Sequence, residues 1–174
     1  MENKLDLTVI VPIVGLDEQA KGLLKTALES VAVQKVSPVK VLYVLPKDDS
    51  ILELLKEAIH YETDKEYDFI QSIIQDDATD FCSLVNYAVS QVETKYFTIL
   101  EYNSEYTPTY FKLVKEYSES EEYSQMSGFL ANTAIAAREQ GNLRHVPLML
   151  LAILARTGSG VVPIRPAREA GLVS

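Results

Sequence analysis

Apolar residues along the first 118 positions occur in two alternating patterns. Short runs rich in apolar and β-branched residues predict buried strands, whereas apolar residues spaced three and four apart predict helices packed on one side. The expected strands are 7–14, 39–45, 69–74 and 96–100. The expected helices are 19–34, 50–61, 80–92 and a last one from about Pro108 through Glu116. Asp48 or Asp49 is expected to cap the second of these helices.

This alternation predicts an α/β fold, with a mostly parallel sheet and helices on both faces, as in Rossmann-like domains. Residues 1–130 are expected to form this α/β unit. The remaining residues, 131–174, contain two further segments of helical character, 134–140 and 145–156, and predict a C-terminal helical appendage.

Charge and composition divide the chain at the same place. Residues 1–130 contain all ten tyrosines and no arginine, and their charge is 11 lysines minus 23 acids, or −12. Residues 131–174 contain all five arginines and no lysine, and their charge is 5 minus 2, or +3. Such asymmetry indicates two roles or two origins for the parts. The acidity of the body argues against broad nucleic-acid binding there.

Other sequence features indicate the cellular compartment of the protein. The longest apolar run, Val146–Ala155, is too short to span a membrane as a helix. Residues 1–6 lack the basic and apolar regions of a leader peptide. Cys82 is the only cysteine and cannot form an internal disulfide, which favours a reducing compartment. We therefore expect a cytoplasmic protein. A Lys- and Tyr-rich, Arg-free body also fits an AT-rich genome, so a phage virion component is the alternative.

Several segments of the body occur in an order typical of one enzyme family. They are Thr8-Val-Ile-Val-Pro-Ile-Val14, Leu28-Glu-Ser-Val-Ala-Val-Gln34, Leu84-Val-Asn-Tyr-Ala88, Lys95-Tyr-Phe-Thr-Ile-Leu-Glu101 and Thr107-Pro-Thr-Tyr-Phe111. In this order, residues 5–118 resemble the GT-A domain of family 2 glycosyltransferases. The resemblance implies a domain that binds a nucleotide-sugar donor together with a divalent cation, Mn²⁺ or Mg²⁺.

The resemblance also implies site residues. The positions matching its donor-binding segments are Pro12, Ile13, Val14, Asp48, Asp49 and Asn86. The positions matching its metal-binding DxD motif, and the acid that follows, are Glu101, Asn103 and Glu105.

This chain departs from the family pattern at the chemically important positions. Asn103 supplies no charge where the motif has an aspartate, so cation binding is expected to be weak or absent. The acids after the second strand are displaced by two or three positions, and Val85 stands where the family has an arginine. The chain is therefore expected to be a truncated, glycosyltransferase-like protein that either transfers a sugar from a nucleotide-sugar donor or, if it is catalytically degenerate, only binds the donor. The alternative is a non-catalytic structural or interaction module that reuses the fold, with Glu101 and Glu105 in a solvated loop.

The C-terminal part carries a separate resemblance. Residues 134–168 resemble a helical stretch of TROVE-domain (Ro-type) RNA-binding proteins, through Ala136–Leu148 and the run that continues to Arg156. Arginines of such a segment could contact phosphates. The alternative is a helical hairpin that packs on the body or on a partner. Because its apolar face is too large to stay exposed, we expect self-association or a protein partner through this segment.

Overall fold

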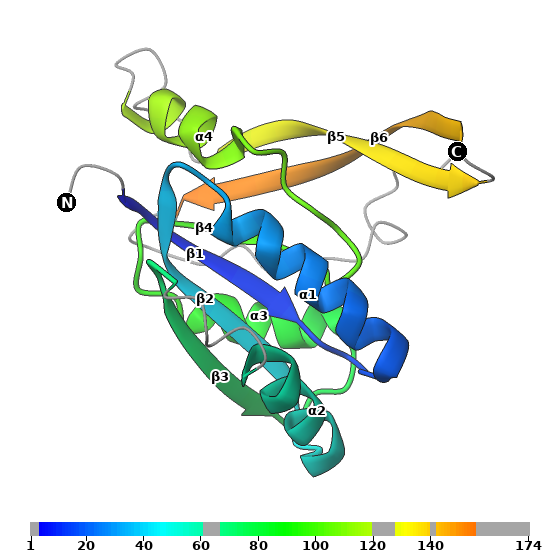
Figure 1. The fold of residues 1–174 in the computed structure, drawn as a ribbon. Helices are drawn as coiled ribbons and strands as arrows, with labels where there is room; N and C mark the ends of the chain where they lie inside the picture. The colour runs from blue at the N-terminus through cyan, green and yellow to red at the C-terminus, as the bar shows by residue number, and fades with distance from the viewer. Residues whose placement is uncertain (1–3, 61–66, 120–127, 140–141, 156–174) are drawn as a thin grey trace, which may run out of the picture.

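The computed structural model describes residues 4–60, 67–119, 128–139 and 142–155 (Figure 1). Strands and helices alternate along the body, as the apolar pattern predicts. In chain order the elements are β1 (Lys4–Pro12), α1 (Glu18–Ala32), β2 (Ser37–Pro46), α2 (Asp49–His60), β3 (Ile70–Asp76), α3 (Phe81–Ser90), β4 (Tyr96–Ile99), α4 (Tyr110–Glu119), β5 (Gly128–Glu139) and β6 (Asn142–Ala155).

The strands form one six-stranded sheet in the order β3-β2-β1-β4-β6-β5. The first four strands are parallel, with β1 paired to both β2 and β4. Helices connect these strands and cover both faces, so the predicted α/β, Rossmann-like fold is confirmed. None of the helices in the described ranges is long and apolar enough to cross a membrane.

Side chains of the central strands alternate between two apolar cores. Val9 and Val11 of β1 face the core formed with α1, α2 and α4, whereas Ile10 faces the core formed with α3. In Figure 1, α1 and α2 accordingly lie in front of the sheet and α3 behind it. Burial on both faces explains why β1 and β2 read as continuous apolar runs.

Aspartate caps begin the three helices that follow the first three strands. Asp17 Oδ1 accepts a hydrogen bond from the amide of Ala20 at 2.7 Å, which caps α1. Asp48 accepts hydrogen bonds from Ser50 and caps α2, and it is one of the two aspartates expected there from the sequence. Asp80 caps α3 in the same way. Each helix therefore starts at the edge of the sheet where the preceding strand ends.

The expected C-terminal helical appendage is wrong for the described residues. Segments 134–139 and 145–155 lie in strands β5 and β6, which pair antiparallel from Gly128 with Leu154 to Glu139 with Asn142. Strand β6 also pairs with β4, at Tyr96 with Ala155 and Phe97 with Leu154. The boundary expected between residues 130 and 131 falls inside β5. The resemblance to TROVE-domain helices therefore has no support, and residues 156–168 of it lie outside the described ranges.

Two physical reasons explain the strands. An apolar run of about ten residues fits a buried strand as well as a helix, so periodicity alone cannot separate them. The free edge of β4 also offers unpaired backbone groups, which an added strand satisfies. Only two residues, 140 and 141, separate the paired Glu139 and Asn142, which is the length of a tight hairpin. A separate origin of residues 131–174 stays a prediction.

The orientation of α1 generates a test of the core. Leu24 is fully buried between α1 and the sheet, whereas its neighbour Leu23 is 44% exposed. We predict that Leu24→Ala lowers the free energy of unfolding by about 2–5 kcal/mol, because it leaves a cavity. Leu23→Ala should change it by about 0.5 kcal/mol or less. Urea denaturation measures both, and equal losses would show that the helix faces the sheet differently.

Candidate functional site

A cavity of about 480 Å³ opens at the carboxyl ends of β1 and β4. These two strands lie side by side, but the chain runs from β1 to β2 and β3 before it returns to β4 on the other side. Such a switch in strand order leaves a crevice between the connections, where α/β proteins bind their ligands. The cavity is lined by Pro12, Val14, Gly15, Leu16, Asp17, Ala20, Phe81, Glu101 and Tyr102.

Backbone hydrogen bonds beyond the strands fix this opening. The amide of Ile13 donates to the carbonyl of Val44 at 2.8 Å, and the amide of Leu100 donates to the carbonyl of Ile10 at 2.8 Å. The chain therefore leaves the sheet at nearly the same level after β1 and after β4. A side chain at Gly15 would meet no atom within 4 Å, so the loop between β1 and α1 leaves space open above this edge.

The lining combines apolar and aromatic surface with two carboxylates. Phe81 at the start of α3 and Tyr102 after β4 offer ring faces, which suit stacking on a planar group. Asp17 and Glu101 offer oxygen acceptors, which suit hydroxyl groups or a cation. Neither lysine nor arginine occurs among the lining residues. The cavity is thus suited to an uncharged planar or hydroxylated ligand, or to an anion that brings its own cation.

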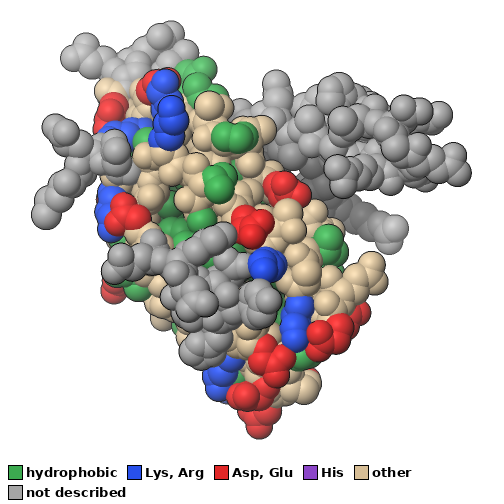
Figure 2. Space-filling view, in the orientation of Figure 1, with side chains coloured by type: hydrophobic (Ala, Val, Ile, Leu, Met, Phe, Trp, Pro, Cys, Tyr) green, Lys and Arg blue, Asp and Glu red, His purple; other side chains and the backbone are tan. Residues whose placement is uncertain are grey.

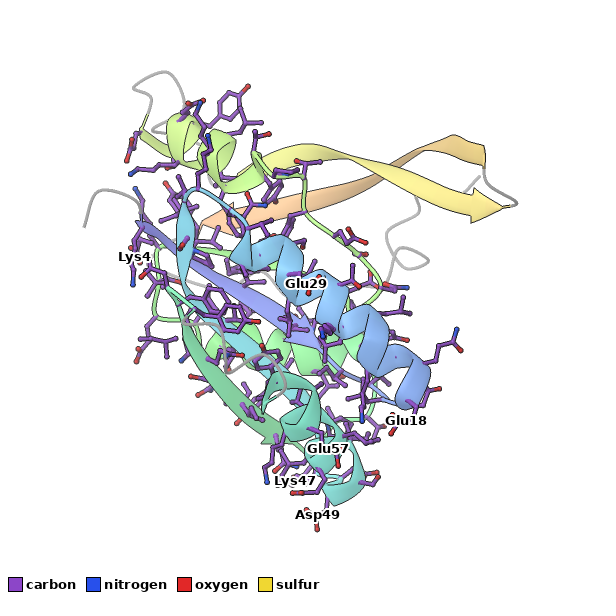
Figure 3. All side chains as sticks on the ribbon, viewed as in Figure 1. Lys4, Glu18, Glu29, Lys47, Asp49 and Glu57 are labelled. Atoms are coloured by element: carbon purple, nitrogen blue, oxygen red, sulfur yellow. The ribbon has the colours of Figure 1, made fainter. Side chains whose placement is uncertain are left out.

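Acidic side chains are frequent at the edge of the sheet where the cavity opens. Those following or ending the four parallel strands are Asp17, Glu18, Asp48, Asp49, Asp76, Asp77, Asp80, Glu101 and Glu105. Figure 2 shows red side chains gathered at the lower end of the molecule, over α2 and the start of α1. In Figure 3, Glu18, Asp49 and Glu57 lie at this end, whereas Lys4 lies at the opposite end.

The two lysines nearest this edge are held by acids. Lys21 Nζ lies 2.9 Å from a carboxylate oxygen of Glu57 and 3.1 Å from one of Glu18. Hydrogen bonds to Glu57 and Glu18 raise the pKa of Lys21. Lys47 Nζ lies 2.9 Å from Asp77, and this hydrogen bond raises the pKa of Lys47. Neither lysine lines the cavity, so the edge keeps a negative potential.

A polar clamp holds the segment that follows β4 against α1. The hydroxyl of Ser30 accepts a hydrogen bond from the amide of Tyr106 at 3.0 Å. Gln34 Nε2 donates to the carbonyl of Thr107 at 2.8 Å, while its Oε1 accepts from the amide of Phe111 at 3.3 Å. Ser30 and Gln34 are two of the three polar residues of the motif Leu28–Gln34, the third being Glu29. They therefore position the segment that carries Glu101 and Tyr102.

Two stacked tyrosines complete the anchoring of this segment. The rings of Tyr106 and Tyr110 are nearly parallel, with centroids 4.4 Å apart. The Tyr106 hydroxyl contacts Thr98 Oγ1 at 3.2 Å, whereas the Tyr110 hydroxyl is buried and has no hydrogen-bond partner among the described residues. Burial raises the pKa of Tyr110 to about 12. Burial also raises the pKa of Tyr106 well above its ordinary value.

Three of the residues expected at the site from the sequence lie together in the cavity, namely Pro12, Val14 and Glu101. Ile13 lies between two of them, but its side chain is fully buried in the core on the α1 face. Asp48 caps α2 and Asp49 is exposed in its first turn.

The other expected residues lie outside the cavity lining. Asn86 is half-buried on α3, and Asn103 and Glu105 are exposed in the segment after β4. Sequence reasoning missed Asp17, Phe81 and Tyr102, although two signals were available. Asp17 begins a helix directly after a strand, and Phe81 begins the helix that precedes β4.

The expected cation can be tested against these oxygen donors. In the ranges where side chains are described, no group of three or more His, Cys, Asp or Glu side chains is placed to hold a metal ion. Mg²⁺ bound with a nucleotide, however, needs only one or two protein carboxylates besides the phosphates. Glu101 in the cavity fits this role. The donor set therefore suits a cation that arrives with a diphosphate, and Glu101 would be its ligand from this chain.

Comparisons with known proteins agree with the fold. The structure is similar to a mannosyltransferase from Pyrobaculum calidifontis in complex with GDP-Man and Mn²⁺, with a TM-score of 0.53 and 12% identity. That match covers 67% of this chain and 33% of the mannosyltransferase, so the chain spans a third of its length. A cytidylyltransferase from Leptospira borgpetersenii matches with a TM-score of 0.50 and 12% identity, over 88% of this chain and 60% of that one.

S. aureus TarS is a further match, with a TM-score of 0.48 and 16% identity over 66% of this chain and 32% of that one. No protein-family model and no curated protein sequence matches the chain. At these identities the comparisons establish the fold alone. The chain has a GT-A-like α/β fold, which it shares with a mannosyltransferase and a cytidylyltransferase.

The clamp generates a second prediction. Gln34→Met keeps the length of the side chain but leaves the amide of Phe111 without its acceptor. It also removes one of the two hydrogen bonds that the carbonyl of Thr107 accepts, the other coming from the amide of Tyr110. We expect it to lower the free energy of unfolding by about 1–3 kcal/mol and to speed hydrogen exchange at the Phe111 amide. The matched control is Gln91→Met at an exposed position, with an effect within about 0.5 kcal/mol. Unchanged protection at Phe111 would contradict the clamp.

The buried tyrosine generates a prediction about pH. The protonated form of Tyr110 is favoured by the fold, since its pKa is about 12 there and about 10 in the unfolded chain. Its contribution to stability is therefore full below about pH 10 and is lost as the pH rises towards 12. Tyr110→Phe should reduce this alkaline loss in urea titrations, and should not destabilise the protein at pH 7, because the removed hydroxyl is unpaired.

Tyr117→Phe is the matched control for this alkaline test. Tyr117 lies on the same helix but is 46% exposed. Its replacement should leave the alkaline loss of stability as in the unmodified protein. The explanation would fail if Tyr110→Phe and Tyr117→Phe behaved alike between pH 10 and 12.

Proposed function

We propose that this chain is the donor-binding part of a family 2 glycosyltransferase-like protein, and that it binds a nucleotide-sugar in the cavity between β1 and β4. The observation that carries the proposal is the position of the cavity at the switch in strand order. This crevice binds nucleotides in α/β folds. The order of the sequence segments that resemble the family supports the same assignment, as does the binding of GDP-Man by the structurally similar mannosyltransferase.

The lining residues suggest how the ligand lies. The nucleoside contacts Pro12 and Val14 at the end of β1, with the ring faces of Phe81 and Tyr102 available for the base. The diphosphate lies towards Glu101, which holds the divalent cation that the diphosphate carries. The cation neutralises the diphosphate, which no lysine or arginine of the lining can do. In a transferase the same cation would stabilise the leaving diphosphate.

A second candidate is a module that binds the donor without transferring the sugar. The cavity offers two carboxylates, of which Asp17 caps α1 and Glu101 is assigned to the cation. Neither is then available as a general base for an acceptor hydroxyl. A structural or interaction module that reuses the fold, for example in a virion, is the corresponding non-catalytic role.

Binding and turnover can be separated experimentally. The full chain is titrated in a calorimeter with GDP-Man and with UDP-GlcNAc, each with Mn²⁺ and with EDTA. Release of GDP or UDP over hours is then followed by chromatography. Mn²⁺-dependent binding with release supports a transferase or hydrolase, and binding without release supports the second candidate. If neither donor binds with Mn²⁺ at millimolar concentration, the proposed site is wrong.

The metal ligand generates a prediction with an internal control. We expect Glu101→Gln to weaken Mn²⁺-dependent donor binding by about tenfold or more, because the cation loses its only charged ligand in the cavity. Glu105→Gln should change it by about twofold or less, since Glu105 is exposed outside the lining. Titration calorimetry measures both variants. An equal loss in the two would instead favour the three-residue cation site expected from the sequence.

A further inference from the structure

Among the helix-capping residues in the described part of the chain, Asp17 is the one that also lines the cavity. Its carboxylate accepts the amide hydrogen bond that caps α1, at 2.7 Å. Asp80 caps α3 with the same geometry, since its Oδ1 lies 3.0 Å from the amide of Ser83, but it does not line the cavity. Asp17 and Asp80 therefore cap their helices in the same way, but only Asp17 adds a charge to the lining of the cavity.

A carboxylate at this place changes which ligands the cavity accepts. The beginning of a helix attracts anions, because its amides are unpaired and its dipole is positive there. In α1 this attraction is already satisfied by Asp17. A phosphate that approaches the start of α1 instead meets the charge of Asp17, in a cavity that is also lined by Glu101. Lys21, in the next turn, is paired with Glu18 and Glu57 and does not compensate.

We propose that Asp17 is a specificity-determining residue, which repels nucleoside diphosphates that carry no cation and leaves uncharged nucleosides unaffected. The proposal rests on the proposed function, since it concerns how the nucleotide site selects its ligand. Two residues of this chain then make diphosphate binding dependent on a cation. Glu101 attracts the cation, and Asp17 penalises the diphosphate that comes without it.

An asparagine at position 17 separates this role from capping. Asparagine caps helices as well as aspartate does, so Asp17→Asn removes the charge and keeps the hydrogen bond to Ala20. Asp80→Asn is the matched control, because it removes the same charge from an equivalent cap outside the cavity. Thermal melts of both variants verify that α1 and α3 remain capped.

The experiment measures binding of UDP, GDP and CDP, and of the three nucleosides, to the full chain by calorimetry. With EDTA present, Asp17→Asn should bind the diphosphate of the preferred base at least about fivefold tighter than the unmodified protein, as expected for one removed charge at several ångströms. Binding of its nucleoside should change by less than about twofold. The gain should shrink as the salt concentration rises. Asp80→Asn should show less than a third of the gain.

Three results would overturn the inference while leaving the proposed function intact, provided that a diphosphate binds with Mn²⁺. The first is unchanged or undetectable diphosphate binding by Asp17→Asn in EDTA. The second is an equal gain in Asp80→Asn, which would indicate only the overall charge of this edge. The third is weaker nucleoside binding by Asp17→Asn, which would make Asp17 a direct ligand contact. If no diphosphate binds any variant even with Mn²⁺, the proposed function and this inference both fail.

Discussion

The parallel pairing of β1 with two neighbours is the constraint on which the rest of the structure depends. Because β1 is buried on both faces and hydrogen-bonded on both edges, its neighbours must be covered by helices and connected by crossovers. Those crossovers leave the sheet in opposite directions after β1 and before β4. The crevice between them follows from the strand order alone. Its chemistry, in contrast, is set by a few side chains at the strand ends, such as Pro12 and Glu101.

The wall of the crevice formed after β4 owes its position to contacts far from the cavity. Strand β4 is only four residues long, so the chain after it gains little support from the sheet. Ser30 and Gln34 supply that support by binding backbone groups of residues 106–111, and the stacked tyrosines fill the space between α1 and β4. A motif near the end of α1 thereby controls a segment more than 70 residues later. Ser30 and Gln34 are polar residues that the apolar pattern of a helix does not require.

The sequence predicted the elements of the body well, because strands buried on both faces and one-sided helices have distinct apolar spacing. It predicted a cap at Asp48 or Asp49 for the same local reason. It did not predict β5 and β6. Whether a segment adds to the edge of a sheet as a strand depends on the unpaired strand at that edge, and the apolar spacing of the segment itself does not reveal this. Within the site, Pro12 and Glu101 follow directly from strand ends. Asp17, Phe81 and Tyr102 did not, because their shared cavity depends on three connections meeting in space.

The charge of the strand-end edge links the fold to the proposed chemistry. Aspartates cap α1, α2 and α3 where these helices begin, and the parallel sheet places all three beginnings at one edge. The same choice that stabilises each helix therefore accumulates negative charge around the crevice. A fold used for nucleotides would be served better by unoccupied helix starts or by lysines. At this edge Lys21 and Lys47 are instead paired with acids, as in Lys47 with Asp77. Nucleotide binding here consequently depends on a cation more strongly than the strand order by itself requires.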